Sequence, residues 1–208
     1  GVVARLVQLE VDEKHQRLRS GRRAMFADTA SAGYRADVFR ALGGFDEGLR
    51  RFEDTDLAFR LVSAGHAVEI VPGAVVYHRH VENLLAYFRR KRRLGLWGAA
   101  VYRRHPARLL EDSRTPWSMR LQMAFAPLTL LGLAAGAWTP VGNGPAALAA
   151  VLFLASAWRF LASALRLGPA MAMAALPFLA TRALALDVGL AEGLIRLLVG
   201  RHPATNAP

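Results

Sequence analysis

The sequence contains no cysteine, which excludes disulfide bonds and metal sites built from thiolates. It begins at Gly1 rather than at a methionine, and no apolar signal region follows a basic start. We therefore expect the chain to be the later part of a longer protein.

Charged side chains are missing from Leu121–Trp158, where no Asp, Glu, Lys or Arg is found. Directly before it, Arg79–Arg120 holds eleven Lys or Arg and only three acids. The formal net charge of +11 would suit nucleic acid, but a basic segment just before an apolar run more often faces anionic lipid head groups. The sequence also lacks an aromatic and basic recognition motif. We expect membrane lipids as partners and no nucleic acid.

The uncharged C-terminal part predicts transmembrane helices. Residues 121–138 are just enough to cross a hydrocarbon core of about 30 Å, a Pro- and Gly-rich break follows over 139–145, and residues 146–165 offer a second span interrupted only by Arg159. Residues 170–199 are a weaker third candidate, because four charged side chains there must be paired, exposed or at an interface: Arg182, Asp187, Glu192 and Arg196. Two spans are therefore firmer than three.

The basic flanks of these spans favour the cytoplasmic side of a membrane, as positively charged loops usually do. We expect a multi-pass protein of the cell inner or plasma membrane, with the water-soluble part in the cytoplasm. Three regions follow from this composition: residues 1–80 as the soluble part, 81–120 as a basic amphipathic interface helix or collar, and 121–208 as the membrane region with two to three transmembrane helices.

The soluble part shows both helical and strand patterns. Apolar residues at helical spacing predict a helix from Val3 to Leu18, a single turn over Asp37–Leu42 and a helix over Asp54–Ala64 that ends before Gly65. Short β-rich runs predict strands, the last two separated by Pro72-Gly73: Met25–Tyr34, Ala67–Val71 and Ala74–His78. The mixture predicts an α/β fold.

Acidic residues gather around a glycine pair. Gly43 and Gly44 precede Phe45-Asp46-Glu47, and Glu53, Asp54 and Asp56 then open a helix. Such clustering costs stability through repulsion unless a cation, a proton or a helix N-terminus compensates it. A catalytic base is one reason to keep such a cluster.

These residues also carry a family resemblance, in an ordered set of motifs. The set comprises Tyr34-Arg35-Ala36-Asp37-Val38-Phe39, Leu42-Gly43-Gly44-Phe45-Asp46-Glu47, Glu53-Asp54-Thr55-Asp56-Leu57, Arg60-Leu61, Gly65, Pro72 and His78. Over Met25–Arg108 it resembles the acceptor half of a family 2 glycosyltransferase. The resemblance implies a partial GT-A fold, with residues 1–80 as the acceptor-side part of the catalytic domain. This fold is an α/β sandwich in which a nucleotide-sugar half precedes the acceptor half, and that first half lies outside this sequence.

The resemblance implies roles for the acidic residues. Asp54 would be the base that accepts the proton of the attacking acceptor hydroxyl, and Glu53 would orient the site or touch the acceptor. Gly43 and Gly44 would let the backbone turn tightly beneath the incoming sugar, within an acceptor loop that also includes Phe45, Asp46 and Glu47. The alternative for Asp54 or Glu53 is a simple helix cap.

Asp54-Thr55-Asp56 spells the Asp-x-Asp pattern of a metal-binding pair. In this family that pair ends a strand of the nucleotide-sugar half, whereas here the triplet opens a helix. We therefore interpret Asp56 as structural, paired with Arg60 one turn later.

His78 is the residue that the resemblance suggests for a divalent metal, Mg or Mn, to be completed by the donor half. A histidine bonded to the backbone at a strand end is the alternative, and His80 has weaker support. Arg89, Arg92 and Arg93 could contact a diphosphate or, more in keeping with their apolar neighbours, lipid phosphates. The Gln-x-x-Arg-Trp signature of processive family members is missing, which argues against a processive polysaccharide synthase.

The resemblance thus implies an enzyme: the C-terminal part of an inverting glycosyltransferase that takes a sugar from a nucleotide-sugar donor at the cytoplasmic membrane face. Its acceptor would be a glycan or a lipid-linked glycan, in envelope glycan or glycolipid synthesis. The alternative is a non-catalytic, membrane-anchored binding module that keeps the fold of the acceptor half.

Overall fold

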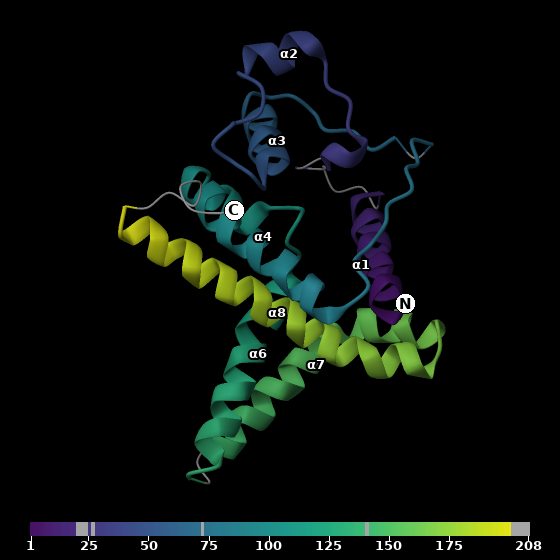
Figure 1. Ribbon diagram of the computed structural model, residues 1–208, viewed down its shortest axis with the longest axis vertical. Coiled ribbons are helices and arrows are strands. Elements are labelled where there is room, and N and C mark those ends of the chain that lie inside the picture. The colour runs from purple at the N-terminus through teal and green to yellow at the C-terminus, as the bar shows by residue number, and fades with distance from the viewer. Residues whose placement is uncertain (20–24, 26–27, 72, 140–141, 201–208) are drawn as a thin grey trace. The chain divides into compact units, whose positions relative to one another are not determined.

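The computed structural model describes residues 1–19, 25, 28–71, 73–139 and 142–200 (Figure 1). In chain order the elements are α1 (Val2–Arg19), the short 3-10 turn η1 (Thr29–Ser31), α2 (Ala36–Ala41), α3 (Glu53–Ser63), α4 (Leu84–Arg104), α5 (Arg108–Glu111), α6 (Trp117–Gly136), α7 (Asn143–Arg166) and α8 (Pro169–Leu198). They form two compact units. Unit 1 comprises Gly1–Glu13, His80–Lys91 and Thr115–Asp187, and unit 2 comprises Lys14–Arg79, Arg92–Arg114 and Val188–Pro208.

The predicted α/β fold is wrong, because the described residues are mainly helical and contain no β-strand. The predicted strands over Ala67–Val71 and Ala74–His78 are irregular apart from one bridge position at Val68, and Pro72 lies outside the described residues. Of the predicted strand Met25–Tyr34, residues 26–27 also lie outside them, and the rest holds η1.

A segment with high strand propensity becomes a β-strand only when a neighbouring segment pairs with its backbone, which explains why these residues are irregular. Val68 and Ile70 pack against Leu18 and Ala58, but several other apolar side chains of residues 67–78 are exposed, among them Val71, Val75, Val76 and Tyr77. The partial GT-A sandwich implied by the resemblance is therefore not formed by the described residues.

The helices predicted in the soluble part are confirmed to within about two residues at each end. α3 ends as the sequence indicates: Gly65 adopts a φ of 85°, and the amides of Gly65 and His66 donate to the carbonyls of Val62 and Leu61 at 3.1 and 3.0 Å. This left-handed C-terminal cap satisfies carbonyls that the helix leaves open.

The core of unit 1 is built from α1, the first part of α4, and the apolar helices. Tyr87 stacks on Phe178 with ring centroids 4.3 Å apart, and Phe178 stacks on Phe160 at 5.9 Å. Leu6 and Val7 of α1 belong to the same cluster. α1 is thus anchored to the membrane-type helices by an apolar face.

α6 and α7 lie side by side as a hairpin within unit 1 (Figure 1). A Cβ placed on Gly132 would lie 2.8 Å from that of Ala146, so the missing side chain lets the two helices approach closely. Large apolar side chains on both helices are exposed, including Leu128, Leu131, Leu133, Leu148, Val151 and Trp158. An apolar surface of this kind is typical of contact with lipid or with a partner.

Among the described residues, three helices, α6, α7 and α8, are long and apolar enough to cross a membrane by length and composition. The third candidate, α8, therefore meets the same length and composition criteria as α6 and α7. The charges that weakened the third candidate are largely paired: Arg182 Nη2 donates to Gln122 Oε1 at 2.5 Å, and Glu192 pairs with Arg92 and Arg196 at 2.7 Å each. Paired charges are the form in which such helices tolerate them.

In unit 2, the last turns of α8 pack against the second part of α4. A Cβ on Gly193 would lie 2.6 Å from the carbonyl oxygen of Leu96, and one on Gly189 would overlap the backbone of Arg92. The spacing of these glycines permits direct backbone contact. Trp97 and Val101 of α4 also belong to a cluster of buried side chains with Leu49, Phe52 and Phe59.

Candidate functional site

The start of α3 in unit 2 carries the predicted acidic cluster. Phe52, the residue before the helix, has a φ of 66° and a ψ of 10°, and its carbonyl accepts the amide of Asp56 at 2.8 Å. Glu53, Asp54 and Asp56 all lie in the first turn, where the free amides and the helix dipole favour negative charge. The helix start thus compensates part of the repulsion between the carboxylates.

Asp54 is almost fully buried, and its hydrogen bonds converge on one oxygen. Oδ1 accepts the amide of Thr55 at 2.7 Å and the hydroxyl of Thr55 at 3.1 Å, and Arg114 Nη1 lies 3.5 Å away. Within the described part of the chain, no residue donates to Oδ2. One carboxylate oxygen of Asp54 is therefore held while the other remains available for a further donor.

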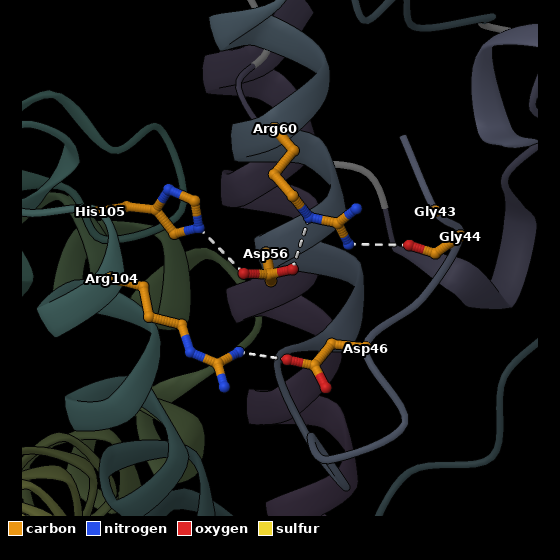
Figure 2. A pocket seen from close by; sticks show the side chains of 7 residues that line it. All are labelled: Gly43, Gly44, Asp46, Asp56, Arg60, Arg104 and His105. Carbon is orange, nitrogen blue, oxygen red and sulfur yellow. Dashed lines mark hydrogen bonds and ion pairs between the residues drawn. The ribbon is translucent and has the colours of Figure 1, made fainter. Parts of the chain in front are cut away.

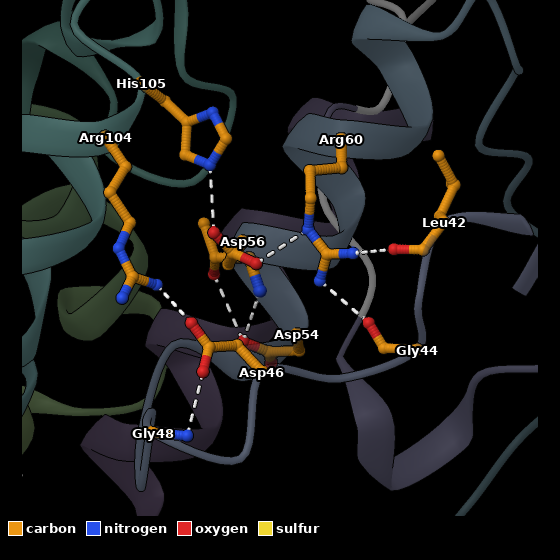
Figure 3. Close-up of polar contacts among 10 residues, drawn as sticks. Leu42, Gly44, Asp46, Gly48, Asp54, Asp56, Arg60, Arg104 and His105 are labelled. Atoms are coloured by element: carbon orange, nitrogen blue, oxygen red, sulfur yellow. Dashed lines mark hydrogen bonds and ion pairs between the residues drawn. The ribbon is translucent and has the colours of Figure 1, made fainter. Parts of the chain in front are cut away.

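Asp56 is the structural partner that the sequence predicts. Its Oδ2 accepts from Arg60 Nε at 2.8 Å, which confirms the predicted pair, and its Oδ1 lies 2.9 Å from His105 Nε2 (Figure 3). Arg60 also donates to the carbonyls of Leu42 and Gly44 at 2.5 and 2.8 Å. A single arginine thus ties the acidic helix start to the glycine loop.

The glycine loop has the tight turn that the sequence predicts. Gly43 and Gly44 have φ values of 77° and 69°, and their amides donate back to the carbonyls of Arg40 and Phe39 at 3.0 and 2.9 Å. Glycine adopts this left-handed conformation without steric cost. α2 ends here, and the chain turns toward Asp46.

The next three residues of the predicted acceptor loop lie in different surroundings. Phe45 packs edge-on against Tyr34 and Phe39, with centroids 5.9 and 5.3 Å apart. Asp46 accepts the amide of Gly48 at 2.8 Å and pairs with Arg104. Glu47 is exposed. Asp46 is the loop residue that links this segment to α4.

A pocket of about 300 Å³ opens between the glycine loop, α3 and the C-terminal end of α4 (Figure 2). Gly43, Gly44 and Asp46 of the predicted loop line it, together with four residues for which the sequence suggested no binding role: Asp56, Arg60, Arg104 and His105. Asp54 and Glu53 are not among the lining residues. The structure therefore brings three of the predicted site residues to a pocket, and Asp54, two positions before Asp56 on α3, does not line it.

Tyr34 belongs to the surroundings of the acidic cluster. Burial raises the pKa of its phenol, and the negative charges of Asp54 and Glu53 raise that pKa further. The hydroxyl oxygen is buried and makes no hydrogen bond within the described part of the chain. The phenol of Tyr34 therefore stays neutral beside the carboxylates.

His78 is not one of the residues that line the pocket. Its side chain is exposed, and Nδ1 lies 3.1 Å from the carbonyl oxygen of Arg79. Over residues 1–19, 25, 28–71, 73–139 and 142–200, no three His, Asp or Glu side chains gather in a way that could hold a metal. The described residues do not fit a metal site by themselves, so we derive no step through a metal.

The predicted basic contacts are also not at the pocket. Arg89 and Arg93 are exposed, and Arg92 pairs with Glu192 of α8 at 2.7 Å. The cations that meet the acidic cluster are instead Arg60, Arg104 and Arg114. Arg104 and Arg114 could not be selected from the sequence, because nothing in their spacing distinguishes them from other arginines of the basic segment.

Comparison with known proteins places the chain in a family. The family model described as "Glycosyl transferase family group 2" matches residues 3–181. Two relatives, pre-mycofactocin glycosyltransferases of Mycobacterium tuberculosis strains CDC 1551 and H37Rv, are each 31% identical over 143 residues, which is 68% of this chain. The O-antigen chain rhamnosyltransferase WbaN of Salmonella anatum is 38% identical over 60 residues, 29% of this chain.

The chain spans 27% of the length of the two mycobacterial relatives and 19% of the Salmonella protein. No solved structure matches it. The family match covers α1, the glycine loop, α3, the basic segment and most of the apolar helices. The chain belongs to glycosyl transferase family group 2.

Proposed function

We propose that this chain forms the acceptor-side and membrane-anchoring part of an inverting glycosyltransferase, with Asp54 as its base. The observation that carries the proposal is the buried carboxylate of Asp54, which Thr55 and Arg114 hold through Oδ1. Asp56, two positions later on the same helix, lines the pocket. Family membership supports a sugar donor and an acceptor as the two substrates.

In the proposed reaction, Asp54 accepts a proton from the acceptor. An acceptor hydroxyl oxygen attacks the anomeric carbon of a nucleotide sugar, the new C–O bond forms as the bond to the diphosphate oxygen breaks, and the nucleoside diphosphate leaves. A hydroxyl is a weak nucleophile near neutral pH, so a carboxylate must accept its proton as the bond forms. Oδ2 of Asp54, to which no described residue donates, is the atom we assign to this step.

Pocket chemistry supports an acceptor with hydroxyl groups. Carboxylates and guanidinium groups line it, including Asp46, Arg60 and Arg104. Such groups accept and donate several hydrogen bonds at once, as recognition of a sugar requires. We propose a glycan or lipid-linked glycan as the acceptor. One relative is named as an O-antigen chain rhamnosyltransferase.

The apolar helices support a membrane location for the reaction. α6, α7 and α8 can each cross a membrane by length and composition, and the basic segment before them favours the cytoplasmic side. Nucleotide sugars are made in the cytoplasm, so we propose that the acidic cluster faces it. A divalent Mg or Mn ion remains a prediction, whose ligands the described residues do not assemble.

The test is Asp54→Asn in the full-length membrane protein, assayed with UDP-glucose, GDP-mannose and dTDP-rhamnose as donors. Loss of the base should lower kcat by at least about 100-fold, whereas calorimetric binding of the nucleotide sugar should stay within about twofold. Asp37→Asn is the matched control, because that aspartate is exposed and pairs only with Arg35 among the described residues.

Full activity of Asp54→Asn would refute the base assignment. If the wild-type protein turns over no donor of the panel, the enzymatic proposal is wrong and the non-catalytic binding module takes its place.

A further inference from the structure

Arg114 is a residue of unit 2 that reaches the acidic helix start from another part of the chain. It lies in the connection between α5 and α6, and its Nη1 is 2.6 Å from Thr55 Oγ1 and 3.5 Å from Asp54 Oδ1. Thr55 in turn donates to the same oxygen of Asp54. The guanidinium therefore holds Asp54 both directly and through the threonine hydroxyl.

The guanidinium of Arg114 also stacks on the ring of Phe52, whose backbone has an unusual conformation. Its central carbon lies 4.3 Å from the centroid of Phe52, which is the only described residue other than glycine with a positive φ. This conformation costs about 1–2 kcal/mol for a residue with a Cβ. Phe52 is buried against Trp97 and its neighbours, so the core holds the ring where Arg114 can stack on it.

The backbone of Arg114 is fixed as well. Its amide donates to Asp112 Oδ1 at 2.7 Å, and Oδ2 of the same buried carboxylate accepts the hydroxyl of Tyr102 on α4. Main chain and side chain are thus anchored at separate points. An arginine held in this way has little freedom left to lose when it orients a neighbour.

We propose that Arg114 is a positioning residue for Asp54. The inference rests on the proposed role of Asp54 as the base. Arg114 and Thr55 both engage Oδ1, which restrains rotation of the carboxylate and directs Oδ2 toward the attacking hydroxyl. Correct orientation of a reacting group lowers the barrier without tightening substrate binding.

The experiment compares Arg114→Gln, Arg114→Lys and Arg108→Gln in the full-length membrane protein, with the panel donor that the wild type turns over fastest. Arg114→Gln should lower kcat about 10- to 100-fold and change the KM for that donor by less than about threefold. Arg114→Lys should recover part of the lost kcat, because it keeps the charge but not the planar fork.

Arg108→Gln is the matched control. Arg108 connects the same part of the chain to the other end of α3, where its Nη2 donates to Ser63 Oγ at 3.1 Å. It should keep wild-type kcat and KM. If Arg114 only stabilised the fold, Arg114→Gln would have a lower thermal unfolding temperature, and kcat of the folded protein would be unchanged. That result would overturn the inference.

If Arg114→Gln does not fold, Arg114→Lys becomes the test variant. A kcat lower than that of the wild type by at least about fivefold would support the inference, whereas a wild-type kcat would overturn it. The outcomes separate the two proposals. An inactive Asp54→Asn together with a fully active Arg114→Gln removes only the role of Arg114, whereas an active Asp54→Asn or an inactive wild type removes both.

Discussion

Each unit has a buried carboxylate next to cationic side chains, but the two carboxylates differ in how many of their oxygens are hydrogen-bonded. In unit 1, Glu10 Oε1 lies 2.6 Å from Lys91 Nζ and 3.5 Å from Arg182 Nη1, and Oε2 accepts the hydroxyl of Tyr87 at 2.8 Å. In unit 2, contacts to Asp54 reach Oδ1, and no described residue donates to Oδ2. A carboxylate with both oxygens engaged stabilises the fold, whereas one with an oxygen left over can accept a proton.

Electrostatics support the structural role of Glu10. Burial would raise the pKa of Glu10, but the adjacent charges of Lys91 and Arg182, with the hydrogen bonds of Lys91 and Tyr87, lower it to about 2. Glu10 therefore stays ionised near neutral pH. In unit 2, the carboxylates of Asp46 and Asp56 line an open pocket with Arg60, Arg104 and His105.

The largest effect on stability is expected from Glu10→Gln. Removing one partner of a buried ion pair leaves Lys91 and Arg182 uncompensated, which should lower the free energy of unfolding by about 3–5 kcal/mol. Thermal unfolding of the detergent-solubilised protein measures it. Asp54→Asn should lose at most about 1 kcal/mol, since an amide oxygen can still accept from Thr55. Equal losses in the two variants would contradict the distinction between the units.

Acid should produce the next largest effect, again in unit 1. Because the pKa of Glu10 is lowered from 4.5 to about 2, its stabilisation is fully present above about pH 4.5 and is lost as the pH falls toward 2. The total loss is on the order of 3 kcal/mol. Unfolding temperatures measured from pH 6 to pH 3 should fall more steeply for the wild type than for Glu10→Gln. Parallel curves would show that Glu10 is not the group responsible.

Sequence patterns predicted the helices well because the information is local. The apolar spacing of Leu57 and Leu61 and the stop at Gly65 determine α3 without reference to the rest of the chain. The Asp56 and Arg60 pair was predictable for the same reason, since residues one turn apart on a helix meet. The acidic helix start and the glycine turn were therefore accessible from sequence.

The errors concern contacts between distant segments. The β-rich residues 67–78 were predicted as strands on propensity, but a strand depends on pairing that sequence spacing does not reveal. His105 was given no role, yet it contacts Asp56 across 49 positions. Arg114 meets Asp54 across 60 positions. Such contacts follow from how α4 and the connection to α6 pack against α3, which local patterns cannot specify.

The smallest expected effect is a difference between alanine variants at two neighbouring glycines of the pocket, Gly43 and Gly44. Both have a positive φ, 77° for Gly43 and 69° for Gly44, so an alanine at either position costs about 1–2 kcal/mol in backbone energy. At Gly44 the new Cβ would also lie 3.2 Å from Cε1 of Phe39, whereas at Gly43 it would meet nothing within 4 Å.

Gly44→Ala should therefore unfold at a lower temperature than Gly43→Ala, and it should displace the carbonyl that Arg60 holds. Because Arg60 also pairs with Asp56 and lines the pocket, Gly44→Ala should raise the KM for the acceptor more than Gly43→Ala does. Neither variant should change the acid dependence that Glu10 gives unit 1. If the two alanine variants behave alike in stability and KM, the contact between Gly44 and Phe39 does not shape the pocket, and the loop is set by backbone conformation alone.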